Sequence, residues 1–109
     1  MDIKIQAYLS DIKTSINEIF DFLGDQRDFT EYRNDLKTKK AVERNLEIIG
    51  EAMNRILKID HEFPIQHAKK IIGTRNRIIH AYDAISDEVI WTIVVRELPM
   101  LKNQIDTYL

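Results

Sequence analysis

The sequence predicts an all-α fold, an antiparallel bundle of four to five helices that forms a single domain over residues 1–109. Apolar residues recur every three or four positions through most of the chain, which is the spacing of one helix face. Only three Gly and two Pro are present, too few turn residues for many short strands. With 44% apolar residues, 109 residues can bury one core but not two independent ones.

The first two helices are predicted from their apolar stripes. The first runs from Ile5 to Leu23 and ends at Gly24, which suits a helix C-cap. The second begins near Asp28 or Thr30, ends around Ile59 and is the longest element. Its buried side is expected to carry Leu36, Val42, Leu46, Ile49, Met53, Ile56 and Leu57.

Proline and capping residues place the other two helices. We expect Pro64 in the first turn of a third helix that runs to about Tyr82. Ser86 is a suitable N-cap for a fourth helix, in which Pro99 should introduce a kink or a break. The β-branched run over residues 89–95 would also suit a buried strand, but a lone strand has no partner in a helical chain, so helix is favoured.

Composition and charge exclude several classes of protein. The chain has 16 Lys and Arg against 18 Asp and Glu, which argues against a protein that coats nucleic acid non-specifically. The absence of Cys removes disulfides and thiolate sites. No apolar run approaches the roughly 20 residues of a membrane span, so a cytoplasmic protein with no membrane partner is expected. No Gly-rich phosphate loop or metal-ligand spacing is present, so we expect no cofactor and no metal.

Positive charge is concentrated in the predicted third helix. Between Glu62 and Asp83 no acidic residue occurs, whereas six basic or titratable residues do: His67, Lys69, Lys70, Arg75, Arg77 and His80. Arg75 projects from the middle of an apolar arc, where a guanidinium must be paired or line a cavity open to an anion. Glu51 on the second helix either holds Arg75 or binds nothing. An ordinary solvated helix face remains the alternative interpretation.

The segment GTRNRIIHAY, residues 73–82, resembles the signature of HEPN-domain proteins, and Tyr82 two places after His80 resembles the HepT branch. Residues 42–52, 89–91 and 98–99 resemble other blocks of HepT-like proteins. The resemblance implies a HEPN-type bundle, a homodimer and a metal-independent endoribonuclease toxin of a type II or type VII toxin–antitoxin pair. It also implies an MntA-like nucleotidyltransferase antitoxin that adenylates the motif tyrosine.

Carried onto this chain, the resemblance makes Arg75 and His80 catalytic, Asn76 a supporting residue and Tyr82 the adenylation site. RNA cleavage without a metal needs proton transfer, which suits histidine, and phosphate binding, which suits arginine. On a regular helix Arg75 and His80 lie about 140° apart. They converge on one phosphate only if Arg75 reaches around, the helix frays near Ile79, or two chains combine.

A two-fold dimer would bring two copies of His80 together as acid and base, so we predict a composite cleft at the dimer interface. Lys69, Lys70 and Arg77 would flank this cleft as RNA-binding phosphate contacts. Two alternatives remain open. One is a non-catalytic module that docks a nucleotidyltransferase or binds a nucleotide through the same face, and the other is a purely structural dimeric bundle.

Overall fold

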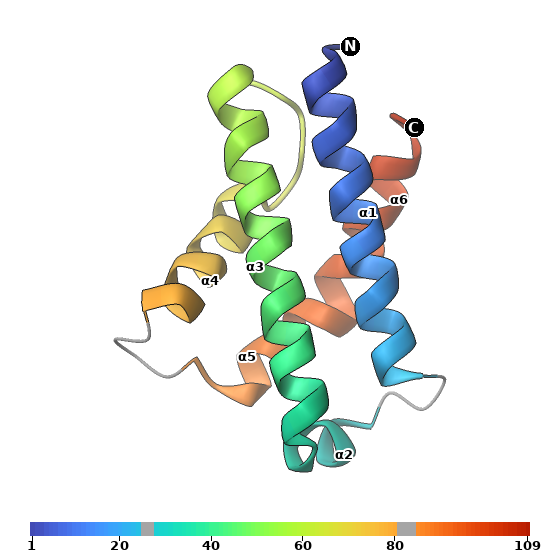
Figure 1. Cartoon of the computed structure of the whole chain (residues 1–109), viewed down its shortest axis with the longest axis vertical. Helices are drawn as coiled ribbons and strands as arrows, with labels where there is room; N and C mark the ends of the chain where they lie inside the picture. Colours follow the sequence, from blue (N-terminus) through green and yellow to red (C-terminus); the bar gives the residue numbers. More distant parts are fainter. Residues whose placement is uncertain (25–27, 81–84) are drawn as a thin grey trace.

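The computed structural model describes residues 1–24, 28–80 and 85–109, and within these ranges it contains helices and no strand. The all-α prediction is therefore confirmed. The elements in chain order are α1 (Ile3–Leu23), α2 (Phe29–Asn34), α3 (Leu36–Ile59), α4 (Ala68–His80), α5 (Asp87–Thr92), a π-helical segment (Ile93–Glu97) and α6 (Leu98–Asp106) (Figure 1).

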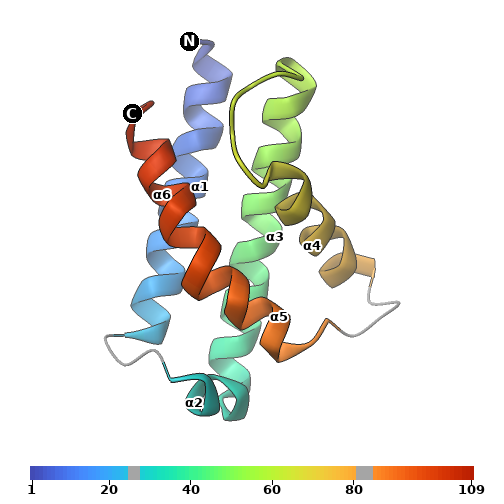
Figure 2. The same ribbon diagram turned by 180° about the vertical axis from the view of Figure 1, so that it is seen from behind.

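Two long antiparallel helices, α1 and α3, form the centre of the bundle (Figure 1). From behind, the continuous arm of α5, the π-helical segment and α6 crosses α1 and α3 obliquely, while α4 lies against α3 (Figure 2). The core lies between these layers, where the apolar stripes predicted for α1 and α3 are buried. Its largest fully buried side chains include Leu9, Ile12, Ile16, Leu46, Ile49, Met53, Ile90 and Leu98.

The predicted start of the last helical region is confirmed. The Ser86 side chain accepts a hydrogen bond from the backbone N–H of Val89 at 3.2 Å, and α5 follows directly. Residues 89–95 are helical, so the strand alternative is wrong. Pro99 occupies the first turn of α6, immediately after the π-helical segment, and the predicted interruption of this helix is therefore present.

The predicted single helix over residues 28–59 is wrong, because Asp35 divides it into α2 and α3. The backbone of Asp35 leaves the helical region, with φ −106° and ψ 89°, and its carboxylate accepts hydrogen bonds from the Thr38 N–H and hydroxyl at 3.1 and 2.6 Å. An Asp that bonds locally to the backbone in this way competes with helix continuation. Leu36, expected in the core, is 67% exposed in the first turn of α3.

The predicted start of the third helix at Pro64 is also wrong, since α4 begins at Ala68. His67 has a positive φ of 63°, which is incompatible with a right-handed helix. The Pro64 carbonyl oxygen accepts hydrogen bonds from Gln104 Nε2 and from the Tyr108 hydroxyl, each at 2.9 Å. The loop before α4 is thus fixed to α6, which sets where the motif helix begins.

Candidate active site

A glycine on α3 sets the position of the motif helix α4. Gly50 is buried where the two helices meet, and a Cβ added to it would lie 2.3 Å from Cβ and 2.9 Å from Cγ of Arg75. No side chain fits in that space. The two helices therefore approach closely at this point, and the base of Arg75 lies directly against the α3 backbone.

The Arg75 guanidinium is held by two neighbours. Its Nη2 lies 2.7 Å from Glu51 Oε2, and its Nη1 donates to Asn76 Oδ1 at 2.8 Å. The side chain is only 25% exposed, and Nε is buried without a hydrogen-bond partner among the described residues. Of the open alternatives for this arginine, the structure shows pairing, and the partner is Glu51.

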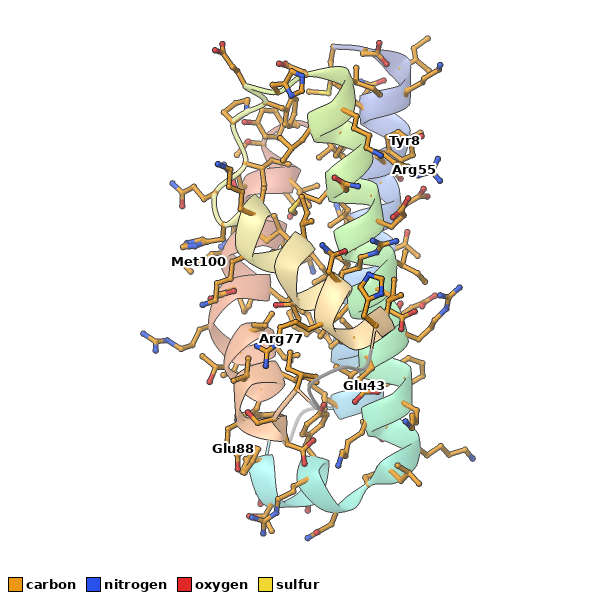
Figure 3. The ribbon with its side chains drawn as sticks, turned by 90° about the vertical axis from the view of Figure 1, so that its left-hand side faces the viewer. Tyr8, Glu43, Arg55, Arg77, Glu88 and Met100 are labelled. Carbon is orange, nitrogen blue, oxygen red and sulfur yellow. The ribbon has the colours of Figure 1, made fainter. Side chains whose placement is uncertain are left out.

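Glu51 joins Arg75 to a second arginine. Its other oxygen, Oε1, accepts a hydrogen bond from Arg55 Nε at 2.9 Å, and this bond is the main reason that the pKa of Glu51 is lowered. Hydrogen bonding to Tyr8, and then to Glu51, raises the pKa of Arg55. Tyr8 and Arg55 lie together at the edge of α1 and α3 (Figure 3). A connected polar chain thus runs from Tyr8 on α1 through α3 to Arg75 on α4.

This chain lies along a cleft of about 280 Å³ between α1, α3 and α4. Ile48, Ala52 and Ile79 supply apolar lining, and Arg44 forms an ion pair with Glu47 at 3.0 Å. The charged side chains of the cleft balance, with three acids and three arginines. They are Asp11, Glu47, Glu51, Arg44, Arg55 and Arg75.

His80 is exposed and is the last residue of α4. The α-helix is continuous from Ala68 to His80, so fraying near Ile79 is not the conformation observed. The guanidinium of Arg75 is turned toward α3 by Glu51. Of the three routes by which Arg75 and His80 could share one phosphate, movement of the arginine side chain and the use of a second chain remain.

The structure does not gather the three predicted RNA-binding residues around this cleft. Lys69 and Arg77 are exposed, and Arg77 lies on the opposite side of α4 from Tyr8 and Arg55 (Figure 3). The Lys70 ammonium group contacts the buried carboxylate of Glu97 on the π-helical segment. Lys70 would have to leave this partner to bind a phosphate.

Sequence reasoning missed Arg44, Arg55 and Gly50. A signal was present, because Arg44, Glu51 and Arg55 recur at helical spacing along one face of α3. Gly50 alone gave no such signal, because Gly73 also lies inside a helix and a Cβ there meets no atom within 4 Å. The feature that escaped notice was that this face of α3 meets the Arg75 face of α4.

The predicted modification site, Tyr82, lies outside the described residues. Within the described ranges, no three His, Asp or Glu side chains are grouped so that they could hold a metal ion. Over the same residues, no helix combines the length and the apolar character needed to cross a membrane.

The helical bundle and its Arg75, Asn76 and His80 motif define a HEPN-type protein, and the comparison with family models identifies its branch. The model described as "Ribonuclease HepT-like" matches residues 12–108. The chain belongs to this HepT-like family.

Its relatives include two proteins of Methanocaldococcus jannaschii, each named "Putative RNase". One is 38% identical over 87% of this chain and 78% of its own length, and the other is 36% identical over 94% of each chain. A protein of Thermococcus cleftensis named "Probable ribonuclease HepT" is 34% identical over 91% of this chain and 90% of its own. No solved structure matches the chain significantly.

Proposed function

We propose that this protein is a metal-independent endoribonuclease that cleaves RNA with Arg75 and His80. The observation that carries the proposal is the arrangement of Arg75, which lies on the same helix as His80. Its guanidinium is fixed in the lining of a cleft by Glu51 of α3 and by Asn76 of α4. A fixed, partly buried guanidinium suits a negatively charged phosphate better than a mobile surface arginine does.

In the proposed reaction the RNA 2′-hydroxyl attacks the adjacent phosphorus and gives up its proton to an imidazole acting as base. The bond from phosphorus to the 5′-oxygen breaks, and that oxygen takes a proton from an imidazolium acting as acid. Arg75 stabilises the additional negative charge on the phosphoryl oxygens. The products are a 2′,3′-cyclic phosphate and a free 5′-hydroxyl.

The two proton transfers need two imidazoles, and the motif supplies one, so we propose a homodimer in which each chain contributes His80. The cleft supports a self-complementary contact, because its three acids and three arginines would meet the same set on a two-fold related copy. Ile79, 44% exposed at the same face, adds apolar surface that such a contact would cover. Lys69 and Arg77 are exposed on α4 outside the cleft, and the proposal keeps them as phosphate contacts for RNA that extends beyond the scissile bond.

The proposal is tested by incubating the purified protein with RNA in the presence of EDTA. We expect cleavage to products with 2′,3′-cyclic phosphate ends, and we expect His80→Ala to abolish it. His61→Ala is the matched control, since His61 is also exposed but lies in the loop before α4. Equal activity of the His80→Ala and wild-type proteins would overturn the assignment.

We further propose that the protein is the toxin of a toxin–antitoxin pair whose partner is an MntA-like nucleotidyltransferase that adenylates Tyr82. The match of Arg75, His80 and Tyr82 to the HepT motif spacing supports this role. An adenylyl group on Tyr82, seven positions after Arg75 in the sequence, would add negative charge, which repels RNA. Co-expression with an MntA-like nucleotidyltransferase should add the mass of one adenylate to wild-type protein and none to Tyr82→Phe.

A further inference from the structure

The Glu51 carboxylate occupies a central position in the cleft, between two arginines of different helices. One oxygen binds Arg75 of α4 and the other binds Arg55 of α3. Arg55 is in turn in contact with Tyr8 of α1. Both oxygens of Glu51 are therefore held in place, and a carboxylate fixed in this way can fix the orientation of the guanidinium that it binds.

The ion pair between Glu51 and Arg75 leaves part of the Arg75 guanidinium available for a ligand. A guanidinium has five N–H groups. Glu51 takes one on Nη2, Asn76 takes one on Nη1, and the Nε–H is buried. One N–H remains on each terminal nitrogen, so Arg75 keeps two donors that a phosphate can accept from.

The ion pair between Glu51 and Arg75 contributes little to the free energy of unfolding. The Glu51 side chain is 36% exposed and the Arg75 side chain 25% exposed, so water screens the interaction. The core is buried elsewhere, between α1, α3 and the α5 to α6 arm. An ion pair at the edge of a cleft, held at both carboxylate oxygens, is better explained by the orientation that it imposes than by the stability that it adds.

We propose that Glu51 is a positioning residue, which orients the Arg75 guanidinium toward the scissile phosphate of RNA while Arg55 fixes Glu51 from the other side. This inference rests on the proposed ribonuclease function and adds to it a residue of α3 outside the sequence motif. Removing the carboxylate charge allows Arg75 to rotate, and an error in placement of about 1 Å can cost a reaction about 100-fold.

The first test compares Glu51→Gln with Glu43→Gln. Glu43 lies about two helical turns before Glu51 on α3, pairs with Lys40 at 3.9 Å and does not line the cleft, so it is a matched control. We expect Glu51→Gln to lower kcat about 10- to 100-fold with little change in KM, and Glu43→Gln to stay within about twofold of wild type. In an Arg75→Lys background, Glu51→Gln should have almost no additional effect, because it acts through Arg75.

The second test requires no cleavage, so it separates failure of the positioning role from failure of the proposed function. In NMR spectra of the wild-type protein, the two terminal nitrogens of Arg75 should give separate signals, because rotation of the guanidinium is restricted. In Glu51→Gln these signals should merge, while those in Glu43→Gln should stay separate.

Two results would overturn the proposal. The first is a guanidinium of Arg75 that is equally immobile in Glu51→Gln and wild type. The second is a rise in kcat or in affinity for a 2′-deoxy RNA analogue in Glu51→Gln, which would mean that Glu51 competes with the phosphate for Arg75 instead of orienting it.

Discussion

Replacement of Gly50 by Ala tests how α4 and its arginine are placed. The added Cβ would lie 2.3 Å from Cβ of Arg75, whereas carbon atoms in contact are about 3.5–4.0 Å apart. Both atoms are attached directly to backbone, so no side-chain rotation relieves the overlap. The helices must separate by more than about 1 Å, which would also move Arg75 relative to Glu51.

The expected change in the free energy of unfolding of Gly50→Ala follows from two opposing effects. Overpacking of this kind costs about 3 kcal/mol at the upper end of its usual range. Ala is favoured over Gly inside a helix by about 1 kcal/mol. We therefore expect Gly50→Ala to lower the free energy of unfolding by about 2 kcal/mol, equivalent to a fall in Tm of about 8–16 °C for a domain of this size. RNA cleavage at a temperature where the variant is folded should fall about 100-fold.

The control is Gly73→Ala, in the middle of α4. A Cβ at Gly73 meets no atom within 4 Å, so only the gain in helix propensity applies and stability should rise by about 0.5–1 kcal/mol. Urea denaturation followed by circular dichroism measures both variants. A Gly50→Ala protein that is as stable as Gly73→Ala and cleaves RNA normally would refute the close approach of α3 and α4.

Three further substitutions test other parts of the structure. Burial raises the pKa of Tyr32, whose hydroxyl has no partner among the described residues. The tyrosine therefore ionises at lower pH in the unfolded chain than in the folded one, and the stability of the wild-type protein should fall as the pH rises above about 10. Tyr32→Phe should gain about 1 kcal/mol at pH 8 and lose this alkaline sensitivity in urea titrations at pH 8 and 10.5; a less stable Phe variant would contradict the burial of an unpaired hydroxyl. Lys70→Met should lower the free energy of unfolding by about 1–3 kcal/mol, because Glu97 is left buried without its partner, and an unchanged urea midpoint would show that the pair is not formed. Ser86→Ala should cost about 1 kcal/mol by removing the cap of α5, which thermal denaturation will measure, and no change in Tm would argue against that cap.

The sequence was sufficient to predict the helical class and the buried stripes, since both depend on spacing along one chain. Ile12, Ile49 and Met53 were expected inside and are fully buried. The boundaries at residues 35 and 64 were wrong for local reasons. Asp35 forms its own hydrogen bonds with Thr38, and the Pro64 carbonyl is bound by residues that lie 40 or more positions later.

The candidate site was predictable in part. The position of Arg75 in an apolar arc predicts that it pairs or lines a cavity open to an anion. In the structure it pairs with Glu51 and also lines the cleft. The helical spacing of Arg55 and Glu51 is visible in the sequence, but the part that Arg55 and Gly50 play in the site is not. It depends on which face of α3 meets α4, and a single helix pattern does not contain that information. The pairing of Lys70 with Glu97 depends in the same way on the path of the chain after α4.

We propose that two copies of His80, one from each chain, act on one phosphate. RNA cleavage in mixtures of wild-type and His80→Ala chains that have been allowed to exchange partners tests this shared site. If both imidazoles are required, an equal mixture should retain about a quarter of the wild-type rate, because only a quarter of randomly assorted dimers carry two intact histidines. Retention of about half, in proportion to the wild-type chains present, would contradict the shared site.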